Sequence, residues 1–136
     1  MKTDDIVNAK TNAELLNKLM NFRAKEYLPS MFDLYNGYKI WMIRADGEQD
    51  KAGFIINIED FGSVVTETYT GSPYSMVLSN SNMHFEKRLI FSIHDSPYIG
   101  RYYMFLGVFE IDLSSNMKIH KWVKVADNYN FPNFKN

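Results

Sequence analysis

The chain has 136 residues, the length of a single domain, with 15 Lys and Arg against 16 Asp and Glu and a formal net charge of −1. This balance excludes a domain that is held on nucleic acid by a strong basic excess alone. The absence of cysteine excludes disulfides, thiol catalysis and zinc sites built on thiolate ligands.

The N-terminal segment "MKTDDIVNAKTNAELL" carries acidic residues and lacks the apolar centre of a signal peptide. No stretch of the chain approaches the ~20 consecutive apolar residues of a membrane span. We therefore expect a cytoplasmic protein with no membrane partner.

The first predicted element is a helix at about residues 12–26. Thr11 and Glu14 match the capping-box pattern, in which two side chains satisfy free backbone amides at the start of a helix. Apolar residues then recur at helical spacing: Leu15, Leu16, Leu19, Met20 and Phe22. Such a narrow apolar stripe predicts a helix that packs as a lid on a sheet.

From Gly37 onward the pattern changes to that of β-strands, and we expect a β-rich core over about residues 37–127. Strands are predicted at about 38–44, 53–58 and 63–71, and another ends before Pro97. The Asp46-Gly47 pair suits the tight turn of a hairpin between the first two of these strands. Residues 128–136 form a polar and aromatic tail. We expect it either to pack on the domain as an extension or to be the end of an excised piece of chain.

The segment "RYYMFLGVFEIDLSSNMKIHKWVKVAD" predicts a hairpin of two long strands. Both faces of its first strand are mostly apolar, so we expect that strand to be central and covered on both sides. One face is predicted to hold Tyr103, Phe105, Gly107, Phe109 and Ile111. The second strand alternates, and the face with His120, Trp122 and Lys124 is expected to be exposed or to line a groove.

Five or six strands with one helix near the start predict a single α+β domain over residues 1–136. The expected architecture is a strongly bent, mostly antiparallel sheet or a small open β-barrel with an N-terminal helix.

The sequence predicts no catalytic residue, metal site or cofactor. The three histidines lack metal-ligand spacing, and neither a phosphate-binding glycine loop nor a nucleophile elbow is present. One enzymatic alternative remains open: His94 and Asp95 are neighbours that could act as an acid–base pair. Replacing His94 without any loss of activity would remove that alternative.

Several residues are candidates for ligand binding. Trp41 or Trp122 could form an aromatic slot that stacks on a flat ligand, although a tryptophan at position 41 is also the simplest anchor for a core. Arg44 and Arg101 could donate forked hydrogen bonds to a phosphate or a base edge. The loop "HDSPYIGRYY" adds His94, Asp95 and Tyr98 just before the central strand, and its alternative reading is a simple turn.

Two segments, "YKIWMIRADGEQDKAGF" and "FLGVFEIDLSSNMKIHKWVKVAD", resemble PUA-like domains of the EVE/SRA type found in bacterial restriction and DNA-processing proteins. The resemblance spans roughly residues 38–127. It implies a bent β-barrel with an aromatic pocket that can hold a modified or flipped base. The positions it carries over to a pocket or its rim are Trp41, His94, Asp95, Tyr98 and Trp122.

The leading hypothesis is therefore a non-catalytic nucleic-acid-binding module that reads a modified or extruded base. The alternative is a small protein-interaction or inhibitor domain from a phage or mobile element, which binds another protein or forms a homodimer. Its motivation is the near-zero charge combined with many Tyr, Phe and Met residues.

Overall fold

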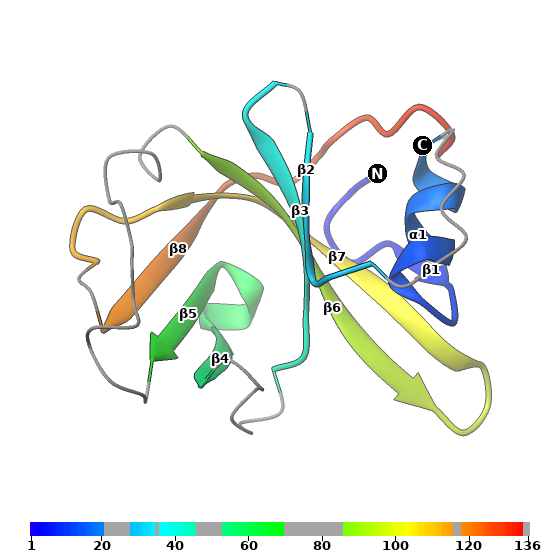
Figure 1. Ribbon diagram of the computed structural model, residues 1–136, viewed down its shortest axis with the longest axis horizontal. Coiled ribbons are helices and arrows are strands. Elements are labelled where there is room, and N and C mark those ends of the chain that lie inside the picture. Colours follow the sequence, from blue (N-terminus) through cyan, green and yellow to red (C-terminus); the bar gives the residue numbers. More distant parts are fainter. Residues whose placement is uncertain (21–27, 35, 46–52, 70–85, 116–117, 135–136) are drawn as a thin grey trace.

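A computed structural model of the chain describes residues 1–20, 28–34, 36–45, 53–69, 86–115 and 118–134. The elements of this part of the chain are β1 (Ile6–Asn8), α1 (Asn12–Leu19), β2 (Met31–Asp33), β3 (Tyr38–Ile43), β4 (Phe54–Glu59), the 3₁₀ turn η1 (Asp60–Gly62), β5 (Val64–Tyr69), β6 (Lys87–Ser96), β7 (Gly100–Ile111) and β8 (Ile119–Ala126). The strands form one strongly curled, eight-stranded sheet, with the order β2-β3-β6-β7-β8-β5-β4 and with β1 beside β7 (Figure 1).

The strands predicted from the periodicity correspond to β3 to β8. Neighbouring strands are antiparallel except for β3 and β6, which run parallel. The predicted bent and mostly antiparallel sheet with a helix near the start is thus confirmed for the described residues, although the helix is shorter than predicted. The Asp46-Gly47 turn lies outside them. The three-residue strands β1 and β2 were not predicted, because such short segments become strands only through pairing with β7 and β3.

Helix α1 begins where the capping residues predict. The Thr11 hydroxyl accepts a hydrogen bond from the Glu14 amide at 3.1 Å. The Glu14 carboxylate accepts one from the Lys10 amide at 2.7 Å, one residue before the amide that a standard capping box uses. The helix was expected to reach residue 26, but it ends at Leu19 because Met20 has an extended backbone. Residues 21–27 lie outside the described part.

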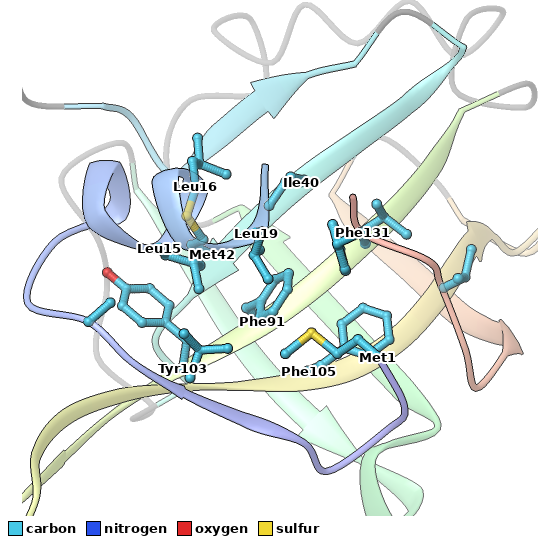
Figure 2. Packing of buried hydrophobic residues seen from close by; sticks show 14 residues of the cluster. Met1, Leu15, Leu16, Leu19, Ile40, Met42, Phe91, Tyr103, Phe105 and Phe131 are labelled. Atoms are coloured by element: carbon cyan, nitrogen blue, oxygen red, sulfur yellow. The ribbon is translucent and has the colours of Figure 1, made fainter. Parts of the chain in front are cut away.

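One face of the sheet packs against α1 and both ends of the chain (Figure 2). Leu15, Leu16 and Leu19 of the helix are fully buried there, as the predicted lid requires. Phe131 packs between Phe91 and Phe105, with ring centroids 5.8 and 5.9 Å away. The described part of the tail is therefore a packed extension of the domain.

The opposite face of the sheet is concave. Trp41 of β3 and Trp122 of β8 have ring centroids only 6.3 Å apart, although β6 and β7 separate their strands within the sheet. This contact is possible only if the sheet curls around that face. The second core cluster fills it: Trp41, Ile43, Ile56, Val65, Ile90, Leu106, Phe109 and Trp122.

Gly107 divides β7 into two halves with opposite side-chain direction. The pairing register shifts beside it on both sides, toward β6 and toward β8. As a result Phe105 packs with the helix-side cluster, whereas Phe109 packs on the concave face. The prediction that Tyr103, Phe105, Gly107, Phe109 and Ile111 share one face is therefore wrong beyond Gly107, because a bulge inserts one residue into the alternation.

Candidate functional site

The concave face contains a buried arginine stacked on two tryptophans. Arg88 of β6 is only 5% exposed. Its guanidinium carbon lies 4.5 Å from the ring centroid of Trp41 and 3.8 Å from that of Trp122. A guanidinium over an indole is attracted by the negative face of the ring, and more strongly where water is excluded. We call Trp41, Glu86, Arg88, His120 and Trp122 the concave cluster.

Glu86 neutralises this arginine and is shared with a lysine. Its carboxylate accepts a hydrogen bond from Arg88 Nε at 2.7 Å and forms an ion pair with Lys39 Nζ at 2.7 Å. Burial raises the pKa of Glu86, but the charges and hydrogen bonds of Arg88 and Lys39 outweigh it, so the pKa is lowered overall. The same carboxylate raises the pKa of Lys39. Glu86 is thus ionised, and each of its two carboxylate oxygens contacts one cation.

Four buried polar atoms of the concave cluster have no hydrogen-bond partner: Arg88 Nη1, His120 Nδ1, His120 Nε2 and Trp122 Nε1. His120 Nδ1 is 3.4 Å from a carboxylate oxygen of Glu67, but the pair lacks hydrogen-bond geometry. Buried polar groups are nearly always paired, so each exception needs a physical explanation. These atoms sit together on the concave face and not at scattered positions in the core.

A second group of polar residues lies along the long β6–β7 hairpin. Asp95 accepts a hydrogen bond from Arg44 Nη1 at 2.9 Å and another from Arg101 Nε at 3.2 Å. These two hydrogen bonds, from Arg44 first and then Arg101, lower the pKa of Asp95. We call Arg44, Asp95 and Arg101 the hairpin cluster. Two partly exposed guanidinium groups share one carboxylate there, which leaves a net positive charge.

The other candidates on this hairpin do not join the cluster directly. His94 is hydrogen-bonded through Nε2 to the Ser92 hydroxyl at 2.7 Å, and its ring stacks on Tyr102 at 5.0 Å. Asp95 is held by the arginines, and neighbouring strand residues point to opposite faces, so the contacts described do not form a His94–Asp95 pair. Tyr98 is 93% exposed at the turn of the hairpin.

The structure thus divides the predicted site residues between two places. His94, Asp95, Tyr98 and Arg101 belong to the end of the β6–β7 hairpin, where Arg44, which follows β3, reaches Asp95. Trp41 and Trp122 lie in the concave cluster. The expectation of an open aromatic slot requires correction. Trp41 and Trp122 are 3% and 0% exposed, and Arg88 covers a face of each ring.

The side-chain direction of β8 also corrects a prediction. The polar-flanked face with His120 and Trp122 is buried, while Ile119 and Val125 of the other face are exposed. Burial here is decided by the curl of the sheet and the Arg88 stacking, and not by the polarity of neighbouring residues.

Sequence reasoning missed Arg88 and the buried role of Glu86. A signal was present, because Arg88 directly precedes the apolar run Leu89, Ile90 and Phe91 within a predicted strand. A charged side chain in such a strand is almost never fully buried without a partner. A nearby carboxylate could therefore have been sought.

Within the described ranges, no group of three or more His, Asp or Glu side chains is arranged to hold a metal ion. The one helix described there is too short and too polar to cross a membrane.

Comparisons with known proteins identify a family and a solved structure that this chain resembles. The model of a family described as the SET and RING associated (SRA) domain matches residues 1–131. Among solved structures, the 5-hydroxymethylcytosine-specific restriction enzyme AbaSI superposes with a TM-score of 0.70 and 16% sequence identity over 94% of this chain. The chain corresponds to 40% of the length of that enzyme, and the likeness shows a shared fold. No curated protein sequence matches the chain significantly.

Proposed function

Since the chain belongs to the family of SRA domains, which are PUA-like and bind DNA, we propose that it is a non-catalytic module that binds DNA and reads a modified base. The family membership confirms the resemblance inferred from the sequence. The observation that carries the proposal is the match of the family model over residues 1–131, nearly the whole chain.

In this proposal the base is read at the concave cluster. A base extruded from a duplex is commonly held by stacking and by hydrogen bonds to its edge, and the cluster offers two indoles together with unpaired polar atoms. Stacking contributes ~1–3 kcal/mol per base. The Arg88 guanidinium lies closer to Trp122 than to Trp41, so an entering base would take over the Trp41 face.

The hairpin cluster is proposed to form the rim that contacts the DNA backbone. Arg44 and Arg101 each keep part of the side chain exposed, and phosphate oxygens can replace Asp95 as partners of a guanidinium fork. Tyr98 and His94 of the same hairpin are proposed to lie beside this contact. Support comes from the net positive charge of the cluster in a chain that is almost neutral overall.

The first prediction concerns discrimination between bases. Titration of the protein with fluorescent oligonucleotides at low salt is expected to give tighter binding to DNA with a 5-modified cytosine than to the same DNA with unmodified cytosine. Because extrusion of a base costs a few kcal/mol and the chain lacks a basic excess, micromolar or weaker affinity that falls with salt is expected.

Equal binding of both oligonucleotides, or no binding at low salt, would contradict base reading. In that case the alternative of a protein-interaction domain gains support. It is favoured by the exposure of Ile119 and Val125 on the outer face of β8. Dimerisation that depends on protein concentration, measured by light scattering, would then be the expected behaviour.

The second prediction concerns the rim. The double variant Arg44→Gln/Arg101→Gln is expected to weaken binding to every DNA sequence alike and to reduce the slope of log K against log salt by about 2, because two phosphate contacts are lost. Asp95→Asn is the matched control, since it removes the competing carboxylate and should strengthen binding. Unchanged salt slopes in both variants would place the DNA backbone elsewhere.

A further inference from the structure

We infer that the chain binds a second copy of itself, and that an acidic tip on one copy docks on a basic hairpin end of the next. The acidic tip is the turn between β4 and β5, with Glu59, Asp60 and Phe61. The basic hairpin end is the hairpin cluster together with Tyr98 and Ile99 of the β6–β7 turn. Self-association stands on the structure alone, whereas its competition with DNA, described below, rests on the proposed function.

The acidic tip presents an aromatic ring to solvent on a braced turn. Phe61 is 111% exposed, more than any other large apolar side chain that the structure describes. The backbone under it has positive φ at both Asp60 and Phe61, +50° and +56°, which bulky residues rarely adopt. The Asp60 carbonyl accepts hydrogen bonds from the Ser63 amide at 3.1 Å and the Ser63 hydroxyl at 2.8 Å. Because this turn is ordered before docking, binding through it costs less conformational entropy.

The charges of the tip restrict what it can bind. Glu59 and Asp60 are both exposed, and neither forms an ion pair with a residue in the described ranges. Two carboxylates beside the ring repel the phosphates of DNA. They also disfavour a contact between two identical tips, which would bring four carboxylates together. The complementary surface therefore combines exposed apolar area with positive charge.

The basic hairpin end has this combination. Tyr98 and Ile99 are 93% and 52% exposed at its turn. The Ser96 hydroxyl accepts hydrogen bonds from the amides of both, at 3.1 and 3.4 Å, so this turn is braced as well. In the hairpin cluster beside them, two partly exposed guanidinium groups share one carboxylate, which leaves a net positive charge for the acidic tip.

The two surfaces lie at separate places in the fold, since η1 joins β4 to β5 and the other turn ends the β6–β7 hairpin (Figure 1). The contact is thus heterologous, and every copy keeps one tip and one hairpin end for further copies. So small a contact predicts weak, reversible association. Its arginines are those proposed to hold the DNA backbone, so DNA and a second copy compete for them.

The experiment is sedimentation velocity without DNA at low salt, with protein up to the millimolar range. The average sedimentation coefficient is expected to rise with protein concentration and to fall with salt. Phe61→Ala should raise the dissociation constant at least about tenfold, as expected for the loss of one buried phenylalanine ring. Leu113→Ala is the matched control. Leu113 is 85% exposed beside an acidic residue, but that residue, Asp112, is paired with Lys121, so association should stay unchanged.

Charge reversal tests the pairing of the two surfaces. Glu59→Lys/Asp60→Lys and Arg44→Glu/Arg101→Glu are each expected to stay monomeric, because like charges would then meet. An equal mixture of the two should associate again. The same mixture with Phe61→Ala in both proteins should associate at least about tenfold more weakly, which separates docking from general attraction between opposite charges. If Arg44→Glu/Arg101→Glu has no thermal transition, Arg44→Gln/Arg101→Gln replaces it and should associate more weakly than the wild type.

The outcomes separate the inference from the proposed function. A protein that stays monomeric at every concentration overturns the inference, and so does association that persists in Phe61→Ala. The fluorescent duplex of the first prediction is expected to dissolve the assembly as it binds. A duplex that binds while the copies remain associated overturns the competition. A duplex that does not bind at low salt overturns the proposed function, and loss of association in Phe61→Ala would still support the contact between copies.

Discussion

Glu86→Gln is expected to lower the free energy of unfolding by about 3–5 kcal/mol at neutral pH, the cost of removing one partner from a buried ion pair. Glu86 accepts from both Arg88 and Lys39, each at 2.7 Å. Arg88 Nε contacts one carboxylate oxygen and Lys39 Nζ contacts the other, so the amide nitrogen of a glutamine, which is a donor, would face one of the two cations. Arg88 would then remain charged inside the concave cluster without the carboxylate that contacts it. Urea denaturation followed by circular dichroism measures the loss.

The double variant Glu86→Gln/Arg88→Met serves as the control, because it removes the unpaired charge together with its partner. We expect it to be more stable than Glu86→Gln alone, since replacing both members of a buried pair is often close to neutral. If Glu86→Gln lowered the free energy of unfolding by less than about 1 kcal/mol, the ion pair of Glu86 and Arg88 would not behave as a buried pair shielded from water.

The difference between the wild type and Glu86→Gln should also depend on pH. The pKa of Glu86 in the folded chain lies below its ordinary value of 4.5. The unfolded chain therefore takes up a proton at higher pH than the folded chain does, and stability falls as the solution is acidified. The advantage of the wild type should be complete above about pH 4.5 and should shrink below it. A difference that stays constant down to pH 3 would be inconsistent with this carboxylate as its source.

Gly107→Ala is expected to cost about 2–5 kcal/mol, from a backbone conformation that only glycine adopts readily and from steric overlap. Gly107 has φ +127°, and an added Cβ would lie 2.8 Å from the backbone oxygen of Ala126 and 3.1 Å from Lys124. The oxygen belongs to the paired strand β8, so relief requires a shift of the backbone. Thermal and urea unfolding measure the effect.

Gly62→Ala is the matched control for this prediction. Gly62 also has a positive φ, +90°, but an added Cβ there meets nothing within 4 Å. Gly62→Ala should therefore lose only the stability that the positive φ costs. The additional loss of stability in Gly107→Ala then measures the steric overlap between β7 and β8. Equal losses in the two variants would show that the contact with Ala126 relaxes freely.

The hairpin of β7 and β8 illustrates what local pattern can predict. Its strands, the central position of β7 and the end of β6 before Pro97 all follow from runs of apolar and β-branched residues bounded by turn residues. The start of α1 follows from Thr11 and Glu14 in the same way. Part of the hairpin cluster was also predictable, since Asp95 and Arg101 are six positions apart across one turn, but its third member Arg44 follows the distant strand β3.

The amino-acid sequence by itself determined the longer strands β3 to β8 and the start of the helix, because these depend on interactions between residues that are close along the chain. Only the tertiary structure decided which face of β8 is buried, where the alternation of β7 reverses, and that Arg88 lies between Trp41 and Trp122. Those features depend on how far the sheet curls. The curl comes from pairing between distant strands and from the bulge at Gly107, and neither leaves a periodic signal in the sequence.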